Sequence, residues 1–149
     1  MRMMSPDFEN DALMPSRSSC DGEGINPELV IQDIPGGTRC LVLFMEDMDS
    51  AGGVLDHWVC YDIPPVSRIG PKQSPGKQGI NSFDNAGYGG PCPSSGTHRY
   101  LFSLYALDSW TGLDSGATRE EVEHAMEGHI LEGCQLIGRY ARQKATPLS

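Results

Sequence analysis

The sequence predicts a mainly β domain, of sandwich or barrel type, with one or two short helices. Residues 39–47, 55–63 and 99–107 are rich in branched and aromatic side chains and have the length of strands. The 18 glycines and 11 prolines are scattered without a period, which is typical of many turns between short strands. Only one segment carries a convincing helix start. The 149 residues fit one domain, 1–149, with a single core.

The charge balance disfavours several classes of partner. The chain has 11 Lys and Arg against 20 Asp and Glu, a net charge of −9. Such a surface repels nucleic-acid backbones and anionic membrane surfaces, so no nucleic-acid partner is expected. No run of about eighteen apolar residues is present, and the first residues lack the apolar centre of a signal peptide. We therefore expect a cytoplasmic protein without a transmembrane segment.

The five cysteines are expected to be free thiols in a reducing compartment. They are odd in number, widely spaced and free of any C-x-x-C motif. A disulfide framework and a zinc ribbon are therefore both poor interpretations, and neither a metal nor a cofactor is expected. The cysteines are Cys20, Cys40, Cys60, Cys92 and Cys134.

The first two predicted strands follow one another closely. Residues 39–47, "RCLVLFMED", are apolar on both faces, which indicates a central strand. Residues 55–63, "LDHWVCYDI", are rich in aromatic and branched side chains and are followed by two prolines. Strict alternation places His57 on the same face as Val59, and Trp58 on the opposite face.

Two stretches are predicted to be irregular. Residues 1–38 are loop-rich, with turn signals in "CDGEGINPEL" and "DIPGGT". Residues 64–97 are rich in glycine and proline and lack any periodic pattern. Their "NSFDNAGYGGPCP" is too specific for a linker, and long loops inside compact domains are usually functional or disordered. The strand 99–107, "RYLFSLYAL", follows directly.

The helix start is the "TREE" sequence. Thr118 is placed as the N-cap and Glu121 at the third helical position of a capping box. Val122 and Met126 supply an apolar stripe, and Gly128 provides a stop. Residues 134–140 then form either a final strand or a continued helix.

Two of the four histidines are interpreted as structural or solvated. His124 and His129 are five positions apart, whereas the two zinc ligands of the H-E-x-x-H motif are four apart. His124 is expected on a solvated helix face, and His129 follows the helix stop.

His57 lies within the predicted strand 55–63, and His98 directly precedes the predicted strand 99–107. There a polar ring costs free energy unless it is hydrogen-bonded, so spacing alone favours satisfied core histidines. His98 and Tyr100 project from the same face of a strand, and Asp47 and Asp49 have the same relation. If the three strands are neighbours, these four side chains and His57 converge at one end of the sheet.

The loop before His98 favours a binding site. Gly89 and Gly90 allow close backbone approach, while Pro91 and Pro93 limit flexibility. Backbone N–H groups in such a loop can bind an anion, although the loop lacks the G-K-[ST] of a P-loop. Catalysis through Cys92 is disfavoured because no helix follows it to lower the pKa of its thiol.

Taken together, these motifs resemble the phosphatidylethanolamine-binding protein family, in its compact bacterial and archaeal branch, which is Raf kinase inhibitor-like. The resemblance covers roughly residues 8–140, and the order of the D-x-D, H-W-V and G-P-C-P…H-R-Y motifs is specific. The matching elements, in chain order, are "CDGEGINPEL", "IPGGTRCLVLFMEDMD", "HWVCYDIP", "NSFDNAGYGGPCP", "GTHRYLFSLYALD" and "EHAMEGHIL".

The resemblance implies an antiparallel, Greek-key β-sandwich with a small pocket for phosphate-like anions at one end. The family motif usually reads Asp-Pro-Asp-Ala-Pro, and this chain has Met48 and Ala51 in place of the prolines. The loss of both prolines removes a rigid turn from that wall. By motif position, the ligand-binding residues are Asp47, Asp49, His57, Gly90, Pro91, His98 and Tyr100.

The function implied is non-enzymatic binding of a small phosphate- or carboxylate-bearing ligand, such as a phosphorylated head group or side chain. Family relatives modulate kinases or other signalling proteins, so a regulatory role with a protein partner such as a kinase is implied. A homodimer is also compatible with the resemblance. The competing class is a hydrolase or phosphoryl-transfer enzyme with His57 or His98 as acid and base. The sequence offers no evident nucleophile or metal set for that class.

Overall fold

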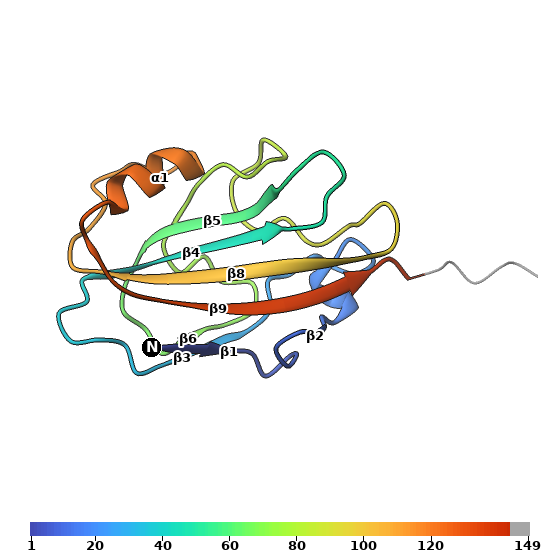
Figure 1. Ribbon diagram of the computed structural model, residues 1–149, viewed down its shortest axis with the longest axis horizontal. Helices are drawn as coiled ribbons and strands as arrows, with labels where there is room; N and C mark the ends of the chain where they lie inside the picture. The colour runs from blue at the N-terminus through green and yellow to red at the C-terminus, as the bar shows by residue number, and fades with distance from the viewer. Residues whose placement is uncertain (144–149) are drawn as a thin grey trace, which may run out of the picture.

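The computed structural model describes residues 1–143. Within this range the chain forms two β-sheets, one α-helix, α1 (Arg119–Met126), and a short 3₁₀ turn, η1 (Ser16–Ser18) (Figure 1). In that range no helix is both long and apolar enough to cross a membrane. The strands are β1 (Arg2–Met4), β2 (Ala12–Leu13), β3 (Leu29–Gln32), β4 (Cys40–Asp47), β5 (Leu55–Ile63), β6 (Arg68–Ile69), β7 (Lys77–Gln78), β8 (Thr97–Leu107) and β9 (Ile130–Ala141).

The larger sheet has six strands in the order β2-β9-β8-β4-β5-β7. Its three central strands, β8, β4 and β5, correspond to the predicted segments and are neighbours, as the convergence of their side chains requires. The sheet is mixed, because β2 pairs with β9 in the parallel direction while its other pairs are antiparallel. The expectation of purely antiparallel sheets is therefore wrong at this edge, and the Greek-key order stays a prediction.

The smaller sheet, β1-β3-β6, lies within the two stretches that the sequence predicts to be irregular, 1–38 and 64–97. Its strands are only two to four residues long, and β1 and β3 pair over three positions. Ile31 of β3 and Ile69 of β6 are buried in one cluster with Leu43 of β4 and Phe102 of β8. That cluster is the core between the two sheets.

The opposite face of the larger sheet packs against α1. Val122 and Met126, the predicted apolar stripe, are buried with Val42 and Phe44 of β4. The capping box is confirmed: the Thr118 hydroxyl accepts from the Glu121 N–H, and the Glu121 carboxylate accepts from the Thr118 N–H.

The chain after α1 is a strand, which resolves the alternative between a strand and a continued helix. Gly128 has φ +78°, a left-handed conformation that ends the helical path. The strand β9 begins at Ile130, earlier than residues 134–140. Its first four residues are all exposed, and the adjacent Ile130 and Leu131 do not show the apolar-polar alternation that predicts a half-buried strand.

A β-bulge interrupts β5 at the histidine. Met45 of β4 pairs with Trp58, but the next residue, Glu46, pairs with Asp56, so His57 is the extra residue. His57 is thereby turned against the ring of Tyr100, whereas Val59 packs on the α1 side. The alternation that placed His57 and Val59 on one face is wrong for this physical reason.

Candidate functional site

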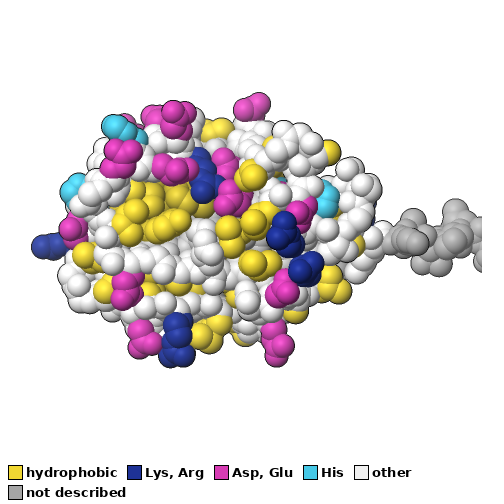
Figure 2. All heavy atoms as spheres, in the orientation of Figure 1, with side chains coloured by type: hydrophobic (Ala, Val, Ile, Leu, Met, Phe, Trp, Pro, Cys, Tyr) yellow, Lys and Arg dark blue, Asp and Glu magenta, His cyan; other side chains and the backbone are white. Residues whose placement is uncertain are grey.

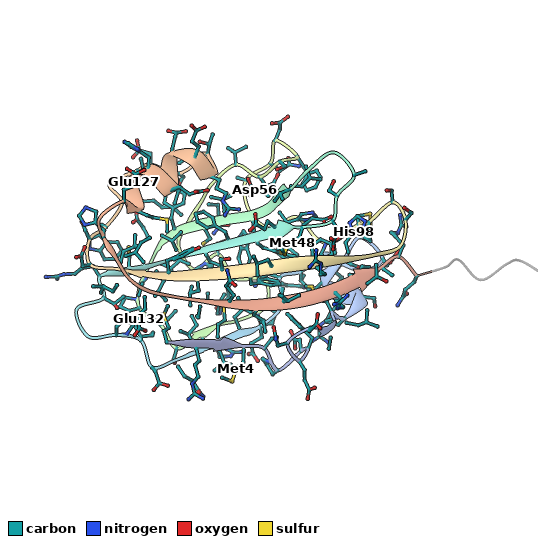
Figure 3. The ribbon with its side chains drawn as sticks, viewed as in Figure 1. Met4, Met48, Asp56, His98, Glu127 and Glu132 are labelled. Carbon is teal, nitrogen blue, oxygen red and sulfur yellow. A yellow bond between two sulfur atoms is a disulfide. The ribbon has the colours of Figure 1, made fainter. Side chains whose placement is uncertain are left out.

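The register of the larger sheet brings the predicted polar residues to one end. Asp47, the last residue of β4, pairs with Tyr100 of β8, and His98 lies two residues away at the start of β8. Figure 3 shows His98 at the end of the sheet where the loops gather, away from α1. Asp47, His57 and His98 line one hollow there, which is the candidate site.

The hollow has a volume of about 210 Å³. Two histidines and one carboxylate supply its ionisable groups, and the remaining lining side chains are small or apolar. The lining residues are Asp47, Ser50, Ala51, Leu55, His57, Phe83, Cys92, Pro93, Ser94 and His98.

Asp47 and His98 form an ion-pair geometry inside the site. The distance from His98 Nδ1 to Asp47 Oδ2 is 2.8 Å, and the two side chains are only 13% and 5% exposed. A carboxylate accepts hydrogen bonds, so Nδ1 carries a proton. The opposite ring nitrogen, Nε2, makes no hydrogen bond with residues 1–143. His98 is therefore oriented by Asp47 with one nitrogen left for a ligand.

His57 is held by the backbone of the following loop. Its Nδ1 lies 2.8 Å from the Gly89 carbonyl, so this nitrogen donates its proton. The ring packs edge-on against Phe83 and Tyr100, with centroids 5.0 and 5.2 Å away. Burial lowers the pKa of His57 below its usual range, although the Gly89 carbonyl and Asp47 oppose that shift. His57 is therefore biased toward the neutral form.

Tyr100 lies beneath the hollow rather than in its lining. It is fully buried, and its hydroxyl has no hydrogen-bond partner within the described part of the chain. Burial, with a smaller contribution from Asp47, raises the pKa of Tyr100 well above its usual range. Tyr100 therefore supports the ring of His57 and holds a neutral hydroxyl next to the site.

Asp49 has a different role from Asp47. Its carboxylate accepts hydrogen bonds from the Arg99 guanidinium at 2.8 and 2.9 Å and from the Arg99 N–H at 2.8 Å. These bonds lower the pKa of Asp49 to about 2. Asp47 also accepts from the Asp49 N–H at 2.9 Å. Polar contacts therefore fix the turn that lacks prolines, and Asp49 does not line the hollow.

Gly90 and Pro91 form the back of the wall and do not line the hollow. A Cβ on Gly90 would come within 2.7 Å of the Ser18 carbonyl oxygen, so this close approach needs glycine. The Pro91 carbonyl accepts from the Cys20 N–H at 3.1 Å. This loop is thus pressed against the segment around η1.

A disulfide joins the same two segments. Cys20 and Cys92 are bonded, so the expectation that every cysteine is a free thiol is wrong. Wide spacing in the sequence does not exclude pairing, because the fold brings positions 72 residues apart together. Cys40, Cys60 and Cys134 are free thiols, as expected.

Sequence reasoning missed several lining residues from the long loop. Phe83 reaches His57 because Asn81 organises the turn: the Asn81 side-chain oxygen accepts from the N–H groups of Phe83 and Asn85 at 2.9 and 3.2 Å. Ser94 also lines the hollow. Both residues stand in or beside the "NSFDNAGYGGPCP" motif, but nothing in that motif shows which side chains face inward.

A larger groove lies along α1. Its volume is about 780 Å³, and five carboxylates line it against one guanidinium, Arg119, which already binds Glu46, Asp56 and Glu123. Figure 2 shows acidic side chains along the upper edge of an apolar patch, in the region where Figure 1 places α1. Negative charge makes this groove unsuitable for an anion, so the smaller hollow remains the candidate site.

Comparison with known proteins gives relatives over nearly the whole chain. The family model for phosphatidylethanolamine-binding protein matches residues 4–141. The UPF0098 protein of Methanothermobacter thermautotrophicus is 42% identical over 150 residues, covering 95% of this chain and 99% of that protein. The UPF0098 protein of Aquifex aeolicus is 43% identical over 152 residues, covering 95% and 89%.

Two solved structures share the fold. A phosphatidylethanolamine-binding protein homolog from Chlamydia trachomatis superposes with a TM-score of 0.93 at 36% identity, covering 95% of this chain and 97% of the other. E. coli YbcL, described as a new member of the mammalian family, gives a TM-score of 0.85 at 22% identity, covering 95% and 98%. With a family model and close relatives that span the chain, this protein belongs to the phosphatidylethanolamine-binding protein family.

Proposed function

We propose that this protein binds small phosphate-like anions, free or as phosphorylated groups on larger molecules, without turning them over. The observation that carries the proposal is the Asp47–His98 pair at the hollow. Asp47 holds Nδ1–H of His98, and a protonated His98 then presents Nε2–H to an anion as a charge-assisted donor. Asp49 is neutralised by Arg99 and adds little repulsion.

The dimensions and lining of the hollow suit a small tetrahedral anion that carries an organic substituent. Its volume of about 210 Å³ lies below the usual range for drug-sized ligands, which begins near 300 Å³. Phe83, at the edge of the hollow, is 47% exposed and offers an apolar surface to the substituent. A phosphorylated head group or side chain meets both requirements.

A regulatory role is the second part of the proposal. It rests on the family resemblance, since relatives of this family modulate kinases and other signalling proteins. A kinase-like partner carrying a phosphorylated side chain would use the same Asp47–His98 pair. A small free ligand would then compete with that partner.

Binding is favoured over hydrolysis by the state of the pocket residues. Cys92 is joined to Cys20 and offers no thiol nucleophile. Among residues 1–143, neither His57 nor His98 has a hydroxyl or thiol as a hydrogen-bond partner. Acid–base catalysis through these histidines remains the competing class, and turnover of a phosphoester that is lost in His98→Ala would support it.

The test is a sulfate titration followed by NMR of the histidine side chains, at about pH 6. We expect the ring signals of His57 and His98 to shift saturably, while those of the exposed His124 and His129 remain in place. The variant His98→Gln should weaken sulfate binding at His57, and His124→Gln should leave it intact. Equal shifts at all four histidines would refute a specific site.

A further inference from the structure

The Cys20–Cys92 disulfide lies at the edge of the candidate site. Cys92 is one of the lining residues, and both cysteines are exposed. Cys40 and Cys60 are buried thiols, and burial raises the pKa of each to about 12. A reductant in solvent therefore reaches the bridge directly, while these buried thiols are shielded from the same solution.

The loop that carries Cys92, residues 88–93, contributes to the site in two ways. Its Gly89 carbonyl accepts a hydrogen bond from His57 Nδ1–H at 2.8 Å and so orients that ring. Cys92 and Pro93 form part of the wall of the hollow. Any displacement of this loop therefore changes both the shape of the hollow and the orientation of His57.

The loop is attached to the segment at residues 15–22. The Tyr88 hydroxyl donates to the Ser18 carbonyl at 2.7 Å, and the Cys20 N–H donates to the Pro91 carbonyl at 3.1 Å. Gly90 lies directly on the backbone of Ser18. Within residues 1–143, the disulfide is the covalent link between these two segments.

The anchoring segment is itself well fixed. Ser18 and Ser19 are buried, and the Ser19 hydroxyl donates to the Ser16 carbonyl at 2.8 Å. The Asp21 carboxylate accepts from the Tyr140 hydroxyl of β9 at 2.6 Å. The bridge thus ties a pocket wall without regular secondary structure to a base that is held by the larger sheet.

We infer that the Cys20–Cys92 disulfide positions the wall of the anion site, so that the affinity of the site depends on the redox state of the bridge. This inference rests on the proposed anion-binding function. Cys20 acts as a positioning residue, because it does not line the hollow and reaches it only through Cys92.

The redox step is a thiol–disulfide exchange with a dithiol. One thiolate of the dithiol attacks a sulfur of the bridge, the S–S bond breaks, and a mixed disulfide forms. The second thiolate of the reagent then closes a ring and releases the remaining cysteine. Two electrons pass to the protein, which gains two thiols, and the dithiol leaves as a cyclic disulfide.

The test compares sulfate affinity by calorimetry in the oxidised protein, the dithiothreitol-reduced protein and the variant Cys20→Ala. We expect affinity to fall by at least about fivefold on reduction, the lower end of typical coupling between two sites. The sulfate affinity of Cys20→Ala should equal that of the reduced protein and should not change on addition of dithiothreitol. The control Cys134→Ala, at a free thiol outside the site, should behave as wild type in both states.

A spectroscopic readout separates positioning from a general loss of structure. The ¹⁵N signal of His57 Nδ1 should shift on reduction, because its acceptor Gly89 lies in the released loop. The signals of His124 should not move. Tyr88→Phe retains the bridge and removes only the contact with Ser18, so it should lower affinity moderately and more strongly after reduction.

Sulfate binding before and after reduction tests the positioning role of the disulfide separately from the anion site. If oxidised wild type binds sulfate at His57 and His98 and reduction leaves both affinity and the His57 signal unchanged, the positioning role is wrong and the anion site stands. If oxidised wild type does not bind sulfate at these histidines, the proposed function itself is wrong.

Discussion

His57 couples the protonation of the pocket to the stability of the fold. Burial holds its folded-state pKa below the ordinary value of about 6.5, so the unfolded chain takes up a proton first as the pH falls. The free energy of unfolding therefore falls as the pH drops below about 6.5, by at most about 1.4 kcal/mol per pH unit from this residue. Urea unfolding should show that, between about pH 7.5 and 5.5, the free energy of unfolding falls less steeply with decreasing pH in His57→Gln than in wild type. Parallel slopes for the two proteins would contradict the buried neutral histidine, and His124→Gln is the control at an exposed ring.

The turn after β4 holds Met48 and Ala51 at the two positions where the family motif has proline. Met48 stands where the family usually has proline, but its N–H donates to the Arg99 carbonyl at 2.9 Å. Met48→Pro would remove that bond and should lower the free energy of unfolding by about 1–3 kcal/mol. Ala51→Pro, at an exposed position within the same turn, should have a smaller effect. A thermal denaturation series decides this, and a stabilising Met48→Pro would show that the turn tolerates the family's proline.

At the scale of single elements, α1 depends on its N-terminal cap. Thr118→Ala removes the acceptor for the Glu121 N–H and should lower the free energy of unfolding by about 1 kcal/mol. Thr118→Ser keeps the hydroxyl and should behave nearly as wild type. Denaturant titration should show a lower midpoint with an unchanged slope for the alanine variant. Equal midpoints for the two variants would mean that the capping box contributes little to stability.

The elements that the sequence predicted best are those with an uninterrupted local signal. Residues 40–47 are buried on both faces except at Glu46, so the predicted strand β4 is confirmed. The "TREE" sequence contains both residues of the capping box, so the predicted start of α1 is confirmed as well. The small sheet was missed because its strands are too short to show a period. The bulge at His57 depends on pairing with Met45 and Glu46 of another strand, which local pattern does not contain.

In the candidate site too, local sequence predicts some features, while others depend on contacts between distant segments. The three central strands and the D-x-D and H-R-Y spacings bring Asp47, His57 and His98 together around the hollow. Spacing could not reveal that Asp49 is bound by Arg99, since that contact crosses between segments 50 residues apart. The motif likewise could not show that Tyr100 would be fully buried below the hollow.

At the scale of the whole molecule, the disulfide closes a long loop. It joins positions 72 residues apart, and in the chain-entropy account such a closure stabilises the folded state by roughly 4 kcal/mol. We expect unfolding in dithiothreitol to occur at a clearly lower denaturant concentration than in oxidising buffer. Cys20→Ala should unfold like the reduced protein in either buffer. An oxidised protein no more stable than Cys20→Ala would contradict a stabilising role for the bridge.

If the two pocket histidines bind the anion, the affinity for sulfate must change with their protonation, and hence with pH. Sulfate keeps its charge in this range, so any change in affinity reports on the protein. Protonation of His98, held by Asp47, supplies a charged donor, while the buried His57 resists the same change.

Calorimetric titration from about pH 8 to pH 6 should show a rising affinity for sulfate, by up to about tenfold per pH unit for each proton taken up on binding. The double variant His57→Gln/His98→Gln should retain the fold and lose this dependence. Affinity that is independent of pH in wild type, or unchanged in the double variant, would mean that the histidines are structural and that the anion site lies elsewhere.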